Sequence, residues 1–364
     1  MVSILFWTAS HLPDIGGFQW STYRLACSLK QLGHKPRFVA RTSGQPWLEP
    51  EVPEVRFEAE TVRGWAIKSG EWLLNHRNEF DLIHVIDCFY DAVDEQLAVL
   101  ERLKLPSVLK VPTEGCIERL MTSANRVSAL GKISAFAILN EGIARELACA
   151  GMDPKKFWFI PNGVGSDRFK PCRNRAGLRE KLGLPPGKIT LLFAGRLVGR
   201  KRLDILLSAM ERLPEYILVI VGSGFGQRDS VEGDVRRRVA SMRNVILREP
   251  TPNILPYFQS SDIHVLVSER EGMSNSVLEG MSCGIPTVAS AISGIREIIE
   301  PGKDGFLVPV GNVLATAEAI SQLAKSGSTR ERMGKAARQK IKKQYDIGII
   351  AAAYEKLYQH ICAK

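Results

Sequence analysis

The chain has 364 residues, more than one ordinary hydrophobic core holds and enough for two domains of about 150–200 residues each. With 45% apolar and 24% charged residues, its composition excludes disordered and fibrous proteins. No apolar run approaches the roughly 18 residues of a membrane span, and the start, MVSILFWTASHLPD, lacks the features of a signal peptide, so we expect a cytoplasmic protein. Seven cysteines without a Cys-x-x-Cys pair indicate reduced, mostly buried thiols rather than disulfides or a structural zinc site.

The net charge of +10 is concentrated in the second part of the chain. Residues 1–163 hold 18 Lys and Arg against 19 Asp and Glu, whereas residues 164–364 hold 31 against 20. We therefore expect the second part to bind an anionic ligand, although a nucleic acid or an anionic membrane surface could use the same surplus. The Arg236–Arg238 run and the Lys340/Lys342/Lys343 cluster are more typical of solvated helix faces. We predict no nucleic-acid partner and leave peripheral membrane contact open.

Short apolar, β-rich runs alternate with stretches of helical period along the whole chain, which predicts an α/β fold with two doubly wound parallel sheets. The strands expected in the first part are Ser3–Thr8, Pro36–Ala40, Leu82–Ile86, Ser107–Val111 and Ala135–Leu139. Those expected in the second part are Ile189–Ala194, Ile217–Val221, Val245–Leu247, Ile263–Val267, Thr287–Ala289 and Phe306–Val308. Pro161 and Asn162–Gly163 interrupt the pattern, so we place the boundary there, with domains at 1–163 and 164–346.

Ligands of such sheets bind beyond the carboxyl ends of the strands, so the loops after the strands are the candidates. The first strand is followed by Gly16–Gly17 and then by a helical pattern over Phe18–Leu32, with Leu25, Leu29 and Leu32 on one face. Two glycines allow close approach of the backbone, and a helix amino terminus favours an anion. A plain tight turn would have the same residues.

Two further loops follow strands of the second part, the first rich in cations and the second in glycine. The strand ending at Ala194 continues into Gly195–Arg202, which carries four cations, among them Arg196 and Lys201. Such cations can neutralise a phosphate that gains charge as it leaves, although a solvated turn would look alike. The next strand ends in a glycine-rich stretch with Gly222 and Gly224, which we interpret as a loop beside a nucleoside rather than as a complete NAD fingerprint.

The loop after Ile263–Val267 is the most informative. It contains Glu271, then Gly272, Met273, Ser274, Asn275 and Ser276, and then Glu279. The small polar residues suit a helix start whose N–H groups can face a phosphate or a sugar. Glu271 precedes that helix and Glu279 lies about two turns along it, so both carboxylates can border one pocket and bind vicinal hydroxyls. A charge near a helix amino terminus and a solvated helix residue are the alternative interpretations.

The residues of this loop and of the segments after it resemble the signature of a known enzyme family. Glu271 and Glu279 with seven residues between them, followed by the run from Met281 to Ala289 and by Gly294–Glu297, resemble the signature of the retaining family-4 glycosyltransferases. Other segments fall in the family's order over nearly the whole chain: Leu12–Pro13 with Gly16–Gly17, Pro161–Val164 with Phe169, and Gly195–Leu197 with Lys201.

The resemblance implies the GT-B fold, in which two Rossmann-like domains face each other across a cleft. The first binds a hydroxyl acceptor and the second a nucleoside diphosphate sugar, a UDP-sugar by default and GDP-mannose as the alternative. It further implies that Arg196 and Lys201 hold the diphosphate, Glu279 the ribose and Glu271 the transferring sugar. Gly16 and Gly17 would approach the donor from the opposite wall, and helix 347–362 would pack back on the first domain.

Three positions depart from the family pattern. Pro112 stands where many relatives carry a histidine, Gly165 where Asp is common, and Arg202 where Gly often follows the lysine. A role for the first domain in the chemistry therefore stays open. We interpret His84 as a packed residue rather than a base, and the aromatic residues of the first part as core rather than as an acceptor platform. These aromatic residues include Trp7, Phe18, Trp20, Phe89 and Tyr90.

The sequence predicts a retaining sugar transfer with no cofactor and no metal ion, because it contains no Asp-x-Asp pair to hold one and the cations can take the ion's place. A nucleotide-sugar epimerase of the same fold and a non-catalytic nucleotide-sugar-binding protein are the alternatives. A dehydrogenase has only the glycine-rich loop at Gly222–Gly226 in its favour.

Overall fold

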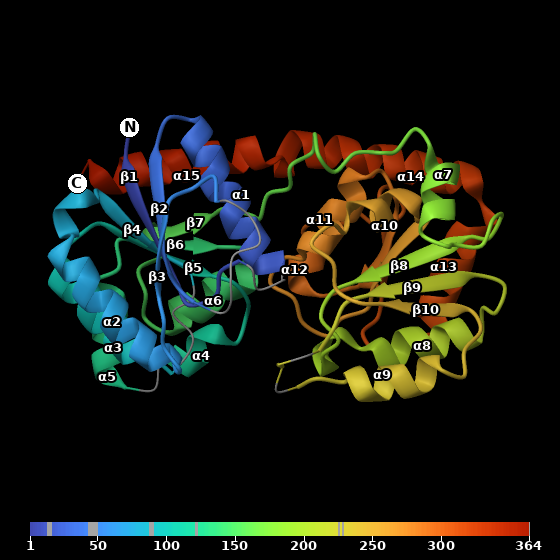
Figure 1. Cartoon of the computed structure of the whole chain (residues 1–364), viewed down its shortest axis with the longest axis horizontal. Helices are drawn as coiled ribbons and strands as arrows, with labels where there is room; N and C mark the ends of the chain where they lie inside the picture. Colours follow the sequence, from blue (N-terminus) through green and yellow to red (C-terminus); the bar gives the residue numbers. More distant parts are fainter. Residues whose placement is uncertain are drawn as a thin grey trace. The chain divides into compact units, whose positions relative to one another are not determined.

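The computed structural model describes residues 1–12, 17–42, 50–86, 91–120, 123–224, 226–227 and 229–363. The chain divides into two compact units, one formed mainly by the residues up to Gly163 together with those from Ile347 onward, and the other mainly by Val164–Asp346. Each unit contains a parallel sheet with helices on both faces (Figure 1). The predicted α/β class with two doubly wound domains is confirmed.

The first sheet has seven strands in the order β3-β2-β1-β4-β5-β6-β7, and every pairing is parallel. The strands are β1 (Ser3–Thr8), β2 (Lys35–Arg41), β3 (Glu54–Phe57), β4 (Leu82–Val85), β5 (Ser107–Val111), β6 (Ala135–Ile138) and β7 (Phe157–Phe159). The central strands are buried along nearly their whole length, as expected for apolar runs covered on both faces.

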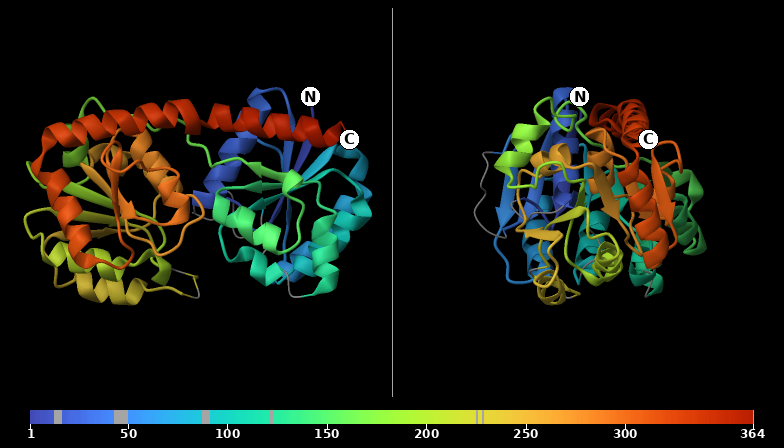
Figure 2. Two further views of the ribbon diagram at one scale, coloured as in Figure 1. Left: turned by 180° about the vertical axis from the view of Figure 1, so that it is seen from behind. Right: turned by 90° about the vertical axis from the view of Figure 1, so that its right-hand side faces the viewer.

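The helices of this unit follow the strands in alternation. They are α1 (Gly17–Gln31), α2 (Val62–Asn75), η1 (Arg77–Glu79), α3 (Val93–Leu103), α4 (Cys116–Leu120), α5 (Ala124–Gly131), α6 (Glu141–Cys149), η2 (Pro154–Lys156) and α15 (Ile347–Cys362). α1 and α15 both pack on the sheet (Figure 2). They share one core with it, to which Leu25, Tyr354 and Phe6 belong. The helix predicted over 347–362 therefore packs on the first sheet.

The second sheet has six parallel strands in the order β10-β9-β8-β11-β12-β13. The strands are β8 (Thr190–Ala194), β9 (Ile217–Val221), β10 (Val245–Arg248), β11 (Ile263–Leu266), β12 (Thr287–Ser290) and β13 (Gly305–Val308). The helices are α7 (Arg175–Lys181), η3 (Gly199–Lys201), α8 (Leu203–Glu211), α9 (Glu232–Val239), α10 (Leu255–Ser260), α11 (Asn275–Ser282), α12 (Ser293–Arg296), α13 (Val313–Lys325), α14 (Gly327–Lys340) and η4 (Ile341–Tyr345). The order places β9, β8 and β11 side by side, so the three loops selected from the sequence leave one edge of the sheet together.

Some predicted details are wrong. β3 and β7, the two edge strands of the first sheet, were not expected, because neither has a continuous buried apolar run and Phe159 is 58% exposed. α1 ends at Gln31 instead of at the predicted Leu32, and Leu32 is exposed, unlike Leu25 and Leu29, with which the pattern placed it on one face. The cysteines that the structure describes are free thiols, but only Cys283 among them is buried, so the expectation of mostly buried thiols is wrong.

Candidate active site

An ion pair joins the loops after β8 and β11. Lys201 Nζ contacts Glu271 Oε1, and the Ser268 hydroxyl donates a hydrogen bond of 2.7 Å to the same carboxylate oxygen. Only 11% of the Lys201 side chain and 12% of the Glu271 side chain are exposed. The interpretation of Lys201 as a solvated turn residue is therefore wrong, whereas Glu271 precedes α11 as predicted and is in addition paired with Lys201.

The backbone around Lys201 explains one departure from the family pattern. Lys201 ends the short helix η3, and Arg202 follows with φ 49°, a left-handed conformation that glycine adopts at low cost. Arg202 can take this position because Asp204 accepts two hydrogen bonds from its guanidinium, at 3.0 and 2.9 Å. A left-handed residue at this point turns the chain from η3 into α8.

Arg196 lies on the same loop and is exposed, with its Nη1 donating to Gln227 Oε1 at 2.8 Å. The backbone on either side of it is bonded to the glycine-rich loop after β9. Gly195 N–H donates to Val221 O at 3.1 Å, and Leu197 N–H donates to Ser223 O at 3.1 Å. The cation-rich loop after β8 and the glycine-rich stretch at the end of β9 are thus bonded to each other, which fixes the backbone that carries Arg196.

Gly222 is required by this loop–loop contact. A Cβ atom at Gly222 would overlap the carbonyl oxygen of Gly195. The amide of Gly224 donates at 2.7 Å to the carboxylate of Glu232, a residue that the sequence analysis did not select. The only feature that marks Glu232 in the sequence is its position as an acidic residue in the first turn of a helix. The structure gives both glycines a role in packing the loops, and their contact with a ligand stays a prediction.

α11 begins as the sequence predicts. Ser274 is its N-cap and accepts from Val277 N–H at 3.4 Å, and Ser276 Oγ lies 3.1 Å from Ser274 Oγ. Met273 and Glu279 are 7% and 8% exposed, so the alternative of Glu279 as a solvated helix residue is wrong. Asn275 is the first residue of the helix.

A second short helix closes on the same loop. A Cβ atom at Gly294, near the start of α12, would overlap the carbonyl oxygen of Gly272. The Gly294–Glu297 part of the signature therefore has a structural reason, because only a glycine allows α12 to approach the backbone of Gly272 this closely.

A buried histidine, not selected from the sequence, lies behind this site. His264 on β11 is fully buried, its ring contacts Phe258 at 5.6 Å between centroids, and its Nδ1 lies 3.4 Å from Thr287 Oγ1. Burial lowers the pKa of His264 to about 3, and the charge of Lys201 acts in the same direction. The imidazole is therefore neutral near pH 7, when it adds no second positive charge beside Lys201.

The remaining predicted residues lie outside these loops. Gly16 lies outside the described residues, and Gly17 begins α1. His84 is fully buried with Nδ1 2.7 Å from the Tyr358 hydroxyl, and burial, followed by the charge of Lys110, holds its pKa well below its usual value. The interpretation of His84 as a packed residue is confirmed.

The aromatic residues of the first part differ in burial. Trp7 is fully buried against Trp65, as predicted for the core, whereas Phe18 and Trp20 are half-buried. Phe89 and Tyr90 lie outside the described residues.

The side chains of the two basic runs form more ion pairs and hydrogen bonds than expected. Each arginine of Arg236–Arg238 has a carboxylate partner, and Lys340 is largely buried against Asp304 and the carbonyl oxygen of Ile298. Arg236 and Arg237 are nevertheless exposed, so the interpretation as a solvated helix face holds for them. It is wrong for Lys340, of whose side chain 16% is exposed, and Arg238 is half-buried.

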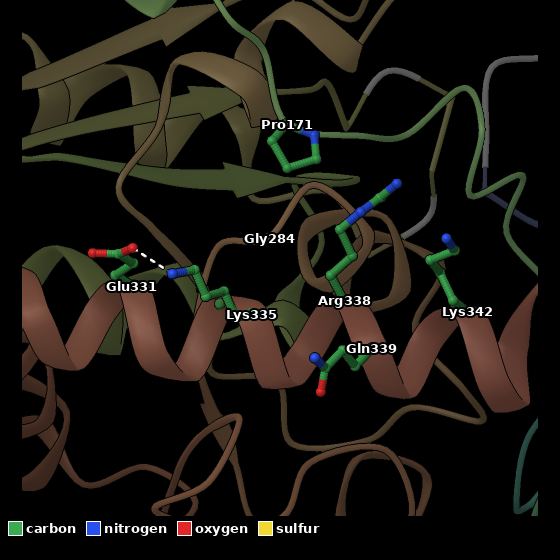
Figure 3. A pocket seen from close by; sticks show the side chains of 8 residues that line it. Pro171, Gly284, Glu331, Lys335, Arg338, Gln339 and Lys342 are labelled. Carbon is green, nitrogen blue, oxygen red and sulfur yellow. Dashed lines mark hydrogen bonds and ion pairs between the residues drawn. The ribbon is translucent and has the colours of Figure 1, made fainter.

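A cavity of about 300 Å³ lies along α14, apart from the loops described above (Figure 3). It is lined by Pro171, Gly284, Glu331, Gly334, Lys335, Arg338, Gln339 and Lys342. Arg338 donates to the carbonyl oxygens of Ser166, Phe169 and Ser282, and Lys335 pairs with Glu331. These cations serve the packing of the unit, and none of the predicted donor-binding residues lines the cavity.

Within the described part of the chain, no group of three or more His, Cys, Asp or Glu residues is placed to hold a metal ion. A search of the same residues for a helix long and apolar enough to cross a membrane found none.

The chain is similar in sequence to known glycosyltransferases. Residues 174–340 match the family described as glycosyl transferases group 1. The chain is 31% identical over 314 residues to D-inositol 3-phosphate glycosyltransferase from Xylanimonas cellulosilytica, covering 83% of this chain and 72% of that protein. It is 24% identical over 373 residues to N-acetyl-alpha-D-glucosaminyl L-malate synthase from Bacillus anthracis, covering 96% and 95%.

Solved structures share the fold at low identity. The crystal structure of Anabaena HepE in complex with UDP and glucose superposes with a TM-score of 0.85 at 18% identity, covering 99% of this chain and 100% of that one. Sucrose-phosphate synthase from Thermosynechococcus elongatus gives 0.83 at 19% identity, covering 99% of both chains. Sequence and fold agree, and the chain belongs to the group 1 glycosyltransferases as a family-4-like enzyme with the GT-B fold.

Proposed function

We propose that this glycosyltransferase moves a sugar from a nucleoside diphosphate sugar, by default a UDP-sugar, to a hydroxyl acceptor with retention of the anomeric configuration and without a metal ion. The observation that carries the proposal is the buried Lys201–Glu271 pair beside the loop of Arg196. The UDP and glucose in the complex of the structural neighbour HepE support the choice of donor.

The proposed chemistry places positive charge where negative charge develops. As the bond between the sugar C1 and the diphosphate oxygen breaks, the leaving nucleoside diphosphate takes the bonding electron pair. Arg196 and Lys201 stabilise that charge, together with N–H groups at the start of α11, so that no divalent ion is needed. The acceptor hydroxyl forms the new bond to C1 on the same face, and its proton passes to the leaving diphosphate oxygen.

The carboxylates hold the neutral parts of the donor. Glu271, fixed by Lys201 and Ser268, is placed to accept hydrogen bonds from the transferring sugar. Glu279 on α11 accepts from the ribose, and Met273–Ser276, Gly222 and Gly224 border the donor. Gly16 and Gly17 complete the proposed set of donor contacts.

The test is a screen of nucleotide release. The purified chain is incubated with UDP-glucose, UDP-N-acetylglucosamine, UDP-galactose and GDP-mannose in the presence of a mixture of sugar, polyol and glycolipid acceptors. We expect release of one nucleoside diphosphate and an α-linked product by NMR, since these donors are α-linked. A β-linked product would overturn retention. Interconversion of donor sugars without nucleotide release would favour an epimerase, and binding without turnover a non-catalytic protein.

A further inference from the structure

Glu232, the first residue of α9, is bonded into the glycine-rich loop after β9. Its Oε2 accepts hydrogen bonds from the Ser223 hydroxyl and from the amide of Gly224, both at 2.7 Å. Its Oε1 accepts from Arg236 Nε at 2.9 Å and from Arg236 Nη2 at 2.6 Å. The carboxylate therefore joins the loop to α9 through both of its oxygens.

This loop is in turn the support for Arg196. Ser223 supplies the carbonyl oxygen to which Leu197 N–H donates, and Leu197 O accepts from Val231 N–H at 2.9 Å, next to Glu232. Val221 O accepts from Gly195 N–H, so the backbone is held on both sides of Arg196. The chain of contacts runs from the Glu232 carboxylate through one loop to the residue that the proposed function places at the diphosphate.

The charge of Glu232 is kept by the same contacts. The hydrogen bond from Ser223, followed by that from Arg236, lowers the pKa of Glu232 to about 2, with the amide of Gly224 acting in the same direction against burial. Behind it, Arg236 also bonds to Glu249 at 2.7 Å, which holds the guanidinium in place. Near pH 7 the carboxylate is ionised, and its hydrogen bonds are of the stronger, charge-assisted kind.

We propose that Glu232 is a positioning residue for sugar transfer, which fixes the glycine-rich loop and through it the backbone that presents Arg196 to the leaving diphosphate. This inference rests on the proposed function and assigns a role to a residue outside its donor contacts. Glu232 acts through Arg196 and touches no reacting atom. Because misplacement of a charge-stabilising group by about 1 Å can cost about 100-fold in rate, loosening the loop should lower turnover more than donor affinity.

The test compares Glu232→Ala, Glu232→Gln and Arg237→Ala with the wild type. Arg237 is the matched control, because it lies on the same helix and pairs only with the exposed Asp234 in the contacts that the structure shows. The substrate is whichever of UDP-glucose, UDP-N-acetylglucosamine, UDP-galactose or GDP-mannose the wild type consumes fastest. We expect kcat to fall about 10- to 100-fold in Glu232→Ala, with a smaller change in the Kd for the corresponding nucleoside diphosphate. Glu232→Gln should lie between, because its amide oxygen can still accept from Ser223 and Gly224.

A double-mutant cycle separates positioning from a general loss of structure. If Glu232 acts through Arg196, adding Glu232→Ala to Arg196→Ala should lower kcat by less than about twofold further. If Glu232→Ala does not fold, Ser223→Ala takes its place, because it removes only one hydrogen bond between the loop and Glu232. Its loss of kcat should be smaller than that of Glu232→Ala, and it should vanish when Arg196→Ala is already present.

The outcomes are distinguishable. The positioning role is overturned if Glu232→Ala has the same turnover as Arg237→Ala. It is also overturned if Glu232→Ala lowers kcat as much in the Arg196→Ala variant as in the wild type. Either result leaves the proposed function intact. A wild-type chain that consumes none of the four donors and binds neither UDP nor GDP overturns the proposed function and this inference with it.

Discussion

Lys201 and Glu271 are 70 residues apart in the sequence and form a buried ion pair at neighbouring strand ends. A buried pair of opposite charges has a large desolvation cost, which its mutual attraction and its additional hydrogen bonds must offset. The hydroxyl of Ser268 supplies one such bond to Glu271. The pair therefore affects the stability of the fold and, under the proposed function, the turnover of the enzyme, and mutations can separate these two effects.

Removal of one partner should damage both stability and turnover. In Lys201→Met the carboxylate of Glu271 is left buried without its counter-ion, which costs about 3–5 kcal/mol in comparable sites. The double variant Lys201→Met/Glu271→Gln removes both charges and should recover most of the lost stability, but its turnover should stay lower than that of the wild type by about 10²–10³. Urea denaturation and nucleotide release measure the two quantities. Recovery of turnover in the double variant would contradict the role of Lys201 at the diphosphate.

Arg196→Ala should lower turnover by about 10²–10³ with a smaller loss of donor binding, because the charge of Arg196 matters most when the diphosphate leaves. The charge run of α9 offers the control, but its first arginine is unsuitable, since Arg236 is bonded to Glu232. Arg237→Ala is the appropriate comparison. Equal steady-state activities of Arg196→Ala and Arg237→Ala would show that the diphosphate site has been misplaced.

The sequence predicts the central strands well because burial on both faces demands continuous apolar runs. β1, β5 and β9 have the predicted bounds, and all five residues of β9 are buried. β3 and β7 were missed because an edge strand of four or three residues is defined by its pairing with a neighbour, which the local pattern does not contain.

The candidate site could likewise be predicted from the sequence only in part. Glycines and cations after strands identify the three loops, because the chemistry of a diphosphate requires such residues there. The contact between Lys201 and Glu271 depends on β8 and β11 being neighbours, which only the sheet order establishes. Glu232 gave no signal beyond a helix start, since its function depends on how the loop after β9 folds back onto α9.

Glu279→Ala should raise the Michaelis constant for the donor more than it lowers turnover. Glu279 is almost buried on α11, and the proposed ribose contact is equally present in the ground state and in the transition state. Steady-state kinetics with varied donor concentration measure the two effects. A loss confined to turnover, with the Michaelis constant unchanged, would argue that Glu279 contacts the reacting sugar instead.

Chelation should leave sugar transfer unchanged. The proposed mechanism meets the charge of the leaving diphosphate with Arg196, Lys201 and helix-start N–H groups, so that no divalent ion enters the reaction. Nucleotide release is measured in the presence of excess EDTA and then after addition of Mn²⁺. Loss of activity with EDTA and its return with Mn²⁺ would contradict this part of the proposal.

The stability of the protein should fall as the pH is lowered from about 6.5, and His264 should account for part of the fall. In the folded protein, burial lowers the pKa of His264 to about 3, with the charge of Lys201 adding to the effect, whereas an unfolded chain binds the proton at about 6.5. Between these values only the unfolded state is protonated, so the free energy of unfolding decreases with falling pH by up to about 1.4 kcal/mol per pH unit. His264→Leu removes this term. Urea denaturation of both proteins at pH 8, 6.5, 5.5 and 4.5 should therefore show a shallower pH dependence in the variant, with the difference from the wild type constant above pH 7. Parallel curves for the two proteins between pH 6.5 and 4.5 would show that His264 is not the group that resists protonation.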